Sequence, residues 1–410
     1  MSGKVLYLSH KNTGSPIDMG DGYIREFLKN GVAFLDYKEL YLQYGRRKTE
    51  EFITRYIKQN DIGILVFSAE GGSFNFSREF FLGLRSGVFV SMMVGDAVYY
   101  FETRDKFYAQ VMDLVVVWDS YPLVRSFEAL GAGSFLLPCA FDRKNYHKIS
   151  PVEKTMDVSF VGCVSGRKGR MEYIEHLTKN GVEVRVFGQG SSGGMVSMAE
   201  MTGIFNRTRI NLNFSDAGGT TCLTGRTRFG NEVKQLKGRI GEVSLCGSFL
   251  LSEDTPGIEN LLLPGKELDI FRTKEELLEK VRFYLADEKE REAIADGGYR
   301  KAVKDFDVSR MIPAFLAELE RLRASKVSRS FRSIVPDAVF ERNFATYRFL
   351  YAIKFVKRFR LSLALEELVL AFKIGKIDLY QLYTFFIEEV VDKFPRIKNF
   401  IKRLFFYRTS

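Results

Sequence analysis

The stretch LKGRIGEVSLCGSFLLSE, Leu236–Glu253, combines a short amphipathic segment, a Cys246-Gly247 step and a continuous apolar run at Phe249–Leu251. A helix that ends at a glycine and leads directly into an apolar strand is typical of parallel sheets, whose buried strands are covered by helices on both faces. The stretch therefore predicts an α/β fold. It also places several charged side chains immediately before a buried strand.

The same alternation extends in both directions from this stretch. Over residues 1–150, apolar runs such as KVLYLS, IGILVFS, VFVSMMV and LVVVWDS alternate with amphipathic segments, and over 151–325 the pattern restarts with MDVSFVGC, VEVRVFG, INLNFS and ELDIF. Short β-branched runs separated by helical patterns predict doubly wound parallel sheets. We therefore expect two such domains joined by a linker, with a ligand cleft between the carboxyl ends of their strands.

Residues 326–410 differ in composition from the rest of the chain. They carry 17 Lys and Arg against 8 Asp and Glu, a net charge of +9 out of +10 for the whole chain, and 18 of the 57 aromatic residues. Phe340, Phe344, Tyr347 and Tyr351 follow a helical period, which predicts a basic, aromatic helical extension.

Two roles are open for this extension. Lys and Arg interleaved with Phe and Tyr suit a helix that lies on an anionic membrane surface. Alternatively, the aromatic residues pack on the two domains or in a homodimer, and 18 aromatic residues are too many for one amphipathic stripe. Because the body of the chain is nearly neutral, nucleic acid is not expected as a partner.

The four cysteines, Cys139, Cys163, Cys222 and Cys246, form no paired motif, and the chain has only three histidines. This pattern favours a reducing compartment and gives no sign of disulfides or of a zinc site. No window reaches the length of about 20 apolar residues that a membrane span needs. We therefore expect a cytoplasmic protein, at most peripheral on the inner face of the membrane.

Two cationic loops are expected at the carboxyl ends of strands in the second domain. In SFVGCVSGRKGR, a predicted helix opens with Arg167, Lys168 and Arg170. Lys237 and Arg239 lie in the first turn of another. Cations at a helix N-terminus are unfavourable unless an anion binds there. A solvated basic turn and a surface pair between Arg239 and Glu242 are the alternatives. Together, the two loops predict a pocket for a nucleoside diphosphate, with Glu242 on the ribose.

Glycines follow two strands of the same domain. Gly162 would let a phosphate approach the backbone, and Gly188-x-Gly190-x-x-Gly193 has the form of a dinucleotide-binding motif with Asp216 as the ribose acid. However, Asp216 lies 28 residues after Gly188 and the motif follows the second strand of its domain. A loop that lines the cleft is therefore favoured over a nicotinamide or flavin site.

Three segments together resemble a known family: SFVGCVSGRKGRMEYIEHLTKNGVEVRVFGQG, IFNRTRINLNFSD and the long stretch LKGRIGEVSLCG to GGYRKAV. In this order they are similar to the donor-binding domain of CgeB-like (spore maturation protein type) glycosyltransferases, a branch of the group 1 transferases with the GT-B fold. The resemblance covers about residues 157–303. It is looser over the N-terminal domain, and the tail after 330 does not share it.

The resemblance implies that Arg167 and either Lys237 or Arg239 neutralise the donor diphosphate. It also implies that Glu242, placed like the second glutamate of a Glu-x7-Glu motif, holds the ribose. Lys234 stands where the first glutamate is expected, so retention or inversion is left open. The predicted donor-binding residues are Gly162, Arg167, Lys168, Gly188, Ser215, Lys237, Arg239 and Glu242.

An inverting enzyme would also need a general base to deprotonate the acceptor hydroxyl. We expect this group at the strand ends of the N-terminal domain, where His10, Glu70, Asp96 and Asp119 lie. Glu70 in SAEGGS is the first choice and Asp96 the second, with His10 as a further candidate. Capping of a helix is the alternative role for either carboxylate.

The sequence thus predicts a glycosyltransferase that moves a sugar from a nucleotide-diphosphate sugar to a glycan, a lipid-linked glycan or a protein. The two cationic loops would stabilise the leaving diphosphate, so neither a metal ion nor another cofactor is expected. A sugar-nucleotide epimerase and a non-catalytic scaffold that binds nucleotide sugars or glycans are the alternatives.

Overall fold

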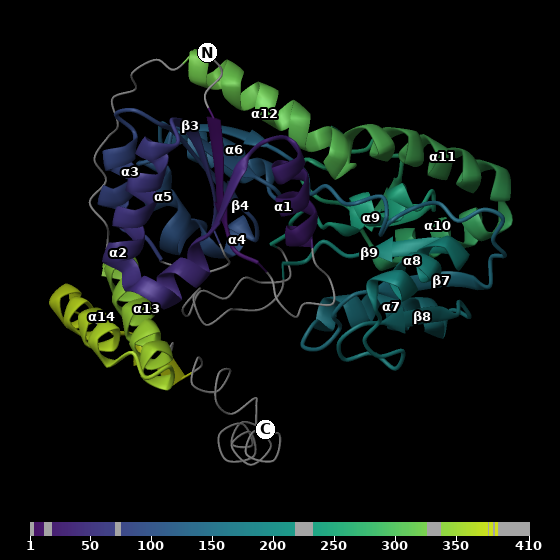
Figure 1. The fold of residues 1–410 in the computed structure, drawn as a ribbon. Helices are drawn as coiled ribbons and strands as arrows, with labels where there is room; N and C mark the ends of the chain where they lie inside the picture. The colour runs from purple at the N-terminus through teal and green to yellow at the C-terminus, as the bar shows by residue number, and fades with distance from the viewer. Residues whose placement is uncertain are drawn as a thin grey trace.

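The computed structural model describes residues 4–11, 19–69, 75–217, 233–325, 338–375, 377–379 and 382–383. Two parallel sheets dominate these residues and form separate domains, the first on the left and the second on the right of Figure 1. Helices α11 (Glu288–Asp305) and α12 (Val308–Ala324) run along the top of the molecule and connect the two. The predicted α/β architecture is therefore confirmed.

The first sheet has six parallel strands in the order β2-β1-β3-β4-β5-β6. Its two central strands β3 and β4 are buried along their whole length, because helices cover both faces. The strands are β1 (Lys4–Ser9), β2 (Ala33–Asp36), β3 (Ile62–Ser68), β4 (Phe89–Val94), β5 (Leu114–Val117) and β6 (Gly133–Leu136). The helices of this domain are α1 (Met19–Lys29), α2 (Tyr37–Gln59), α3 (Arg78–Leu84), α4 (Ala97–Tyr100), the π-helix η1 (Phe101–Asp105), α5 (Lys106–Ala109) and α6 (Tyr121–Ala129).

The second sheet has five parallel strands in the order β11-β10-β9-β7-β8. The strands are β7 (Met156–Val161), β8 (Val184–Phe187), β9 (Thr208–Asn213), β10 (Leu250–Glu253) and β11 (Asp269–Phe271). Its helices are α7 (Lys168–Lys179), α8 (Met198–Arg207), α9 (Arg239–Leu245), the 3-10 turn η2 (Ile258–Asn260) and α10 (Lys274–Ala286). Polar caps fix several helix starts; in α8, Ser197 and Glu200 form a reciprocal capping box.

The chain crosses between the two domains twice, and the crossings are hydrogen-bonded to each other. The backbone N–H of Phe141 donates to the carbonyl of Phe306 (2.8 Å), and the N–H of Val308 donates to the carbonyl of Phe141 (3.1 Å). After the second crossing, α12 packs its apolar face, including Phe315, on the first sheet and α1. The C-terminal end of the second unit therefore contributes to the core of the first.

The extension after residue 337 is helical where the structure describes it, with α13 (Ala338–Lys357) and α14 (Leu361–Ile374) side by side below α2 in Figure 1. Four aromatic residues of α13 are buried in the core of the first domain: Phe340, Tyr347, Tyr351 and Phe355. Arg348 is fully buried; it donates to the hydroxyl of Tyr41 and pairs with Glu367. Packing on the first domain is thus confirmed for α13.

None of the described helices is long and apolar enough to cross a membrane.

Candidate functional site

The carboxyl ends of strands from both sheets meet where the two domains contact each other. The N–H of Leu236 donates to the carbonyl of Asp119 (2.8 Å), and the side-chain amide of Gln235 donates to the carboxylate of Asp96 (3.0 Å). Both acceptors follow strands of the first sheet, whereas both donors precede α9 of the second domain. The predicted cleft residues of the two domains therefore do come together.

Gly162 and Gly188 bring the turns after β7 and β8 into direct contact. The N–H of Gly162 donates to the carbonyl of Phe187 (2.8 Å), and a Cβ at Gly188, whose φ is +114°, would lie 2.3 Å from the carbonyl oxygen of Gly162. A side chain at Gly188 would therefore collide with the neighbouring turn. The following loop folds back on β8, because the N–H of Gly193 donates to the carbonyl of Val186 (3.2 Å). It is a loop, as predicted, and no helix begins there.

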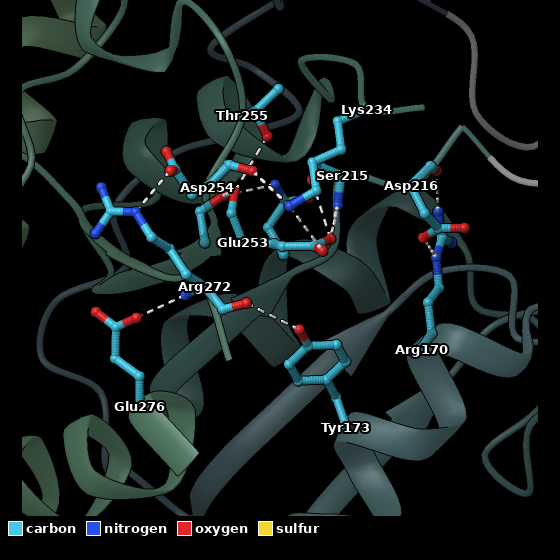
Figure 2. Close-up of polar contacts among 12 residues, drawn as sticks. Arg170, Tyr173, Ser215, Asp216, Lys234, Glu253, Asp254, Thr255, Arg272 and Glu276 are labelled. Carbon is cyan, nitrogen blue, oxygen red and sulfur yellow. Dashed lines mark hydrogen bonds and ion pairs between the residues drawn. The ribbon is translucent and has the colours of Figure 1, made fainter. Parts of the chain in front are cut away.

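The cations at the start of α7 are turned toward the end of β9. Arg170, 8% exposed, pairs with a carboxylate oxygen of Asp216 at 2.5 Å and donates to the carbonyl of Cys163 (2.9 Å). Figure 2 shows the Arg170–Asp216 pair. Arg167 lies 3.5 Å from the other oxygen of Asp216 and donates to the carbonyl of Ala217, whereas Lys168 is exposed. Asp216 therefore anchors this loop to β9.

Helix α9 begins at Arg239, with Gly238 as its N-cap, so Lys237 precedes the helix instead of lying in its first turn as predicted. Arg239 donates to the carboxylate of Glu242 and to the carbonyl of Val161 at the end of β7. Glu242, 7% exposed, also accepts a hydrogen bond from the hydroxyl of Tyr146 (3.3 Å). The pair between Arg239 and Glu242 is thus present, but it is largely buried instead of lying on the surface as the alternative predicted, and the role of Glu242 on a ribose stays a prediction.

Lys237 differs from Arg167, Arg170 and Arg239, which all have partners within the protein. In the part of the chain that the structure describes, its ammonium group has neither an ion pair nor a hydrogen bond. Burial, together with the nearby positive charges of Arg170 and Arg167, lowers the pKa of Lys237 to about 8, although the charges of Asp96 and Asp216 act in the opposite direction. A partly desolvated cation between two arginines is a site that an anion would stabilise.

Lys234, at the position where a glutamate is expected, forms an ion pair with a glutamate from β10. Its ammonium group lies 3.2 Å from Glu253 and donates to the carbonyl of Asp254 (3.1 Å). The other oxygen of Glu253 accepts from both the N–H and the hydroxyl of Ser215 (2.9 and 3.0 Å), as Figure 2 shows. Ser215, a predicted donor-binding residue, is therefore engaged by Glu253.

A second set of contacts holds the strand ends beside Glu253 in place (Figure 2). Arg272 pairs with Asp254 (2.9 Å), its N–H donates to Glu276 on α10 (2.8 Å), and its carbonyl accepts from Tyr173 on α7 (3.2 Å). These contacts connect β10 and β11 with two helices. The position of Glu253 at the cleft edge is thus fixed by the surrounding framework.

Two carboxylates of the first domain lie beside Lys237. Asp96 is exposed and has a left-handed backbone (φ 52°) at the start of α4. Asp119, after β5, is buried, and burial together with the charge of Asp96 raises its pKa to about 7; the N–H groups of Ala97 and Asp96 and the charge of Lys237 act in the opposite direction. The pair therefore places a carboxyl group whose pKa is about 7 where the two domains contact each other.

The other two residues predicted as general bases are His10 and Glu70. His10 lies at the end of β1, where its ring makes an edge contact with Tyr37 at 5.9 Å between centroids. Glu70, the first choice, lies outside the described residues. Glu253, at the end of β10, was not singled out from the sequence; Asp119 was named at a strand end and Arg170 lies in a predicted cationic loop, but neither was chosen as a site residue.

Comparison with known proteins places these features in context. Residues 167–317 match a family described as glycosyl transferase-like. No curated protein matches the sequence. The fold is similar to that of sucrose-phosphate synthase from Thermosynechococcus elongatus, with 11% identity over 79% of this chain and all of the other and a TM-score of 0.53.

HepE of Anabaena, solved in complex with UDP, is also similar, with 14% identity over 77% of this chain and all of the other and a TM-score of 0.54. The HepE complex with UDP-glucose gives 14% identity, coverage of 77% and 98%, and a TM-score of 0.51. At such low identities the likeness shows the fold alone. The chain has the GT-B fold, and the family match over residues 167–317 supports its assignment as a glycosyltransferase.

Proposed function

We propose that the protein transfers a sugar from a nucleoside-diphosphate sugar and that Lys237 holds the diphosphate. Within the described residues the ammonium group of Lys237 has no ion pair or hydrogen bond, and its place beside Arg167 and Arg170 at the junction of the two domains carries this proposal. The complexes of HepE with UDP and UDP-glucose support a nucleotide-sugar donor for a chain of the same fold. A CgeB-like subtype remains part of the proposal.

The chemistry of transfer requires stabilisation of a leaving group. When the bond between the anomeric carbon and the diphosphate oxygen breaks, negative charge develops on that oxygen, and a cation placed there beforehand lowers the barrier. Binding of the diphosphate would raise the depressed pKa of Lys237, because an opposite charge favours the ammonium form. Since cations can fulfil this role, we propose transfer without a metal ion or other cofactor.

For an inverting transfer we propose Asp96 as the general base, with Asp119 as a neighbouring residue whose charge acts on Asp96. Asp96 is exposed and lies near Lys237, whereas Asp119 is buried. Asp96 would take the proton from the acceptor hydroxyl as its oxygen bonds to the anomeric carbon and the nucleoside diphosphate leaves. Glu70 and His10 are the alternative bases from the sequence.

We further propose that the acceptor is a glycan, a lipid-linked glycan or a protein, and that the enzyme acts in polysaccharide biosynthesis in the cytoplasm, at the inner face of the membrane. The basic, aromatic composition of residues 326–410 supports a location near anionic lipid. Either a monomer or a homodimer is compatible with the site, because all the groups invoked belong to one chain.

The test has two parts. Calorimetric titration with a panel of nucleoside diphosphates should give binding that the variant Lys237→Met loses while it stays folded. Product analysis with nucleotide sugars then separates the functions: a transferase forms a glycoside only with an acceptor, an epimerase forms a new nucleotide sugar without one, and a scaffold forms neither. Nucleotide binding that is equal in the wild type and in Lys237→Met would contradict the proposed site.

A further inference from the structure

Exposed apolar side chains gather around the α13–α14 turn and along α14. Single exposed apolar residues are common on protein surfaces, whereas a contiguous apolar patch marks an interaction site. Phe359 in the turn is 91% exposed, and Leu365 and Phe372 on α14 are 62% and 66% exposed. Spacings of three or four residues place four such side chains on one face of α14. We call them the apolar stripe: Leu361, Leu365, Val369 and Phe372.

The orientation of α14 is fixed by its opposite face. Leu363, Ala364 and Ala371 are buried against the first domain. Glu367, on the same side, is buried and pairs with Arg348 at 3.3 Å. The packing therefore leaves the apolar stripe exposed, and α14 cannot bury the stripe without exposing its buried face.

The turn before α14 presents an aromatic ring to the outside. Phe359 has a φ of 56°, a left-handed conformation that bulky residues rarely adopt. Its neighbours Arg358 and Arg360 are both exposed. A bulky residue in a disfavoured conformation with almost no contacts to the protein does not contribute to folding stability, which indicates a role outside the folded chain.

Cations lie near the apolar stripe in two places, the turn between α13 and α14 and a groove between α14 and α2. In the described part of the chain no ion pair is formed by four exposed cations of the extension: Lys357, Arg358, Arg360 and Lys373. A groove of about 850 Å³ separates α14 from α2, with Leu365, Val369 and Lys373 on one wall and a basic run of α2 on the other, Arg46, Arg47 and Lys48. The groove lining contains three carboxylates: Glu51, Glu366 and Glu367. Of these, Glu51 pairs with Arg47.

We propose that Phe359, the apolar stripe and the cations around them form a docking surface for an anionic lipid bilayer. Apolar side chains enter the boundary between headgroups and acyl chains, while Lys and Arg remain with the phosphate groups. A second copy of the chain fits less well, because a two-fold interface would bring the same unpaired cations of both copies together. The bilayer supplies negative charge for the four cations of the extension that form no ion pair within the described residues, whereas Arg46 and Arg47 of α2 already pair with Glu50 and Glu51.

This surface attaches the first domain to the membrane. Helices α13 and α14 pack on that domain and lie away from the second sheet in Figure 1. The carboxylates proposed for the acceptor belong to the same domain, so membrane binding would bring the acceptor side of the cleft toward lipid. The inference does not depend on the donor assignment, because none of its residues belongs to the proposed site.

Vesicle co-sedimentation of the full chain tests the surface. The protein should bind phosphatidylcholine vesicles that contain phosphatidylglycerol and bind pure phosphatidylcholine far more weakly. Phe359→Asn should weaken binding at least about tenfold, because a buried phenyl ring is lost, while asparagine tolerates the left-handed backbone and keeps the fold. Arg358→Gln and Arg360→Gln should each weaken binding about fivefold at low salt.

The matched control is Phe283→Asn, an exposed aromatic residue on α10 of the other domain, which should leave vesicle binding unchanged. Equal binding of the wild type and Phe359→Asn would overturn the proposal, as would equal binding to neutral and anionic vesicles. Light scattering that shows a dimer dissolved by Phe359→Asn, without any effect on lipid, would assign the surface to self-association instead. Nucleotide binding should be unaffected in every variant, which separates this inference from the proposed function.

Discussion

Replacing Lys237 by methionine should make the protein more stable at neutral pH and unable to hold its donor. Burial and two neighbouring arginines lower the pKa of Lys237 from 10.5 to about 8. This difference corresponds to at most about 3 kcal/mol of unfavourable free energy for the charged group in the folded state at neutral pH. Methionine keeps most of the side-chain volume and removes the charge, so the free energy of unfolding should rise by up to that amount.

The pH dependence gives the sign of this effect. Because the folded pKa is depressed, the unfolded chain binds the proton more tightly, and the free energy of unfolding contributed by Lys237 increases as pH rises from about 8 to 10.5. The advantage of Lys237→Met should therefore be full below about pH 8 and vanish near 10.5. Lys304→Met, at an exposed lysine on α11, is the control and should show no such advantage.

Denaturant unfolding at neutral and alkaline pH measures the difference in stability between the wild type and Lys237→Met. Calorimetric titration with UDP measures the nucleotide affinity of both. Loss of one charge-assisted contact to a phosphate, worth about 1.5–3 kcal/mol, should lower nucleotide affinity by one to two orders of magnitude. A variant that is less stable than the wild type at pH 7, or that binds UDP with unchanged affinity, would refute the argument that Lys237 is held unpaired for the donor.

The other predictions concern the base, the pH profile and the extension. Asp96→Asn should lower the transfer rate by roughly 10²–10⁴-fold with nucleotide affinity kept, as single-turnover kinetics and calorimetry would show; an unchanged rate would exclude Asp96 as the base. The profile of kcat/KM should fall below about pH 7, where Asp119 gains a proton, and above about pH 8, where Lys237 loses one; Asp119→Asn should abolish the acid limb, and an unchanged limb would contradict its role. Arg348→Met should lower the free energy of unfolding by about 3–5 kcal/mol, because Glu367 is left buried and unpaired; denaturant unfolding of the single variant and of the double variant with Glu367→Gln, which should recover much of the loss, would check this.

Most strands could be predicted from the sequence because they are buried on both faces and read as continuous apolar runs. β4 in VFVSMMV and β5 in LVVVWDS are examples. β2 (Ala33–Asp36) is not in the predicted alternation, since it is a four-residue edge strand that is only partly buried. Helix α2 is also missing from it; its polar sequence is interrupted at Gly45, where φ is +76°.

The sequence was sufficient to predict where the candidate site lies, but not which carboxylates pair with its cations. The sequence indicates that cationic loops follow the strands of the second domain, and the structure places Arg167, Arg170 and Lys237 together. It does not indicate that Asp216 and Glu253 neutralise some of the cations, because such pairing depends on the order of strands in the sheet. For this reason the unpaired Lys237 could not be distinguished from its neighbours beforehand.

The composition of residues 326–410 did not decide between packing on the domains and binding to a membrane. Its aromatic residues serve two different purposes, since those of α13 are buried in the first domain while Phe359 and Phe372 are exposed. A helical period reveals that one face is apolar but does not reveal what covers it. The final residues 384–410, which include KNFIKRLFFYRTS, lie outside the described part of the chain.

The function proposed for this site is the transfer of a sugar from a nucleoside-diphosphate donor. The most direct measurement follows release of the nucleoside diphosphate from a panel of nucleotide sugars, with and without glycan and lipid-linked acceptors. The account predicts release that depends on an acceptor, matches glycoside formation one to one and is lost in Lys237→Met. Release that is unchanged in Lys237→Met, or conversion of the donor into another nucleotide sugar without an acceptor, would contradict it.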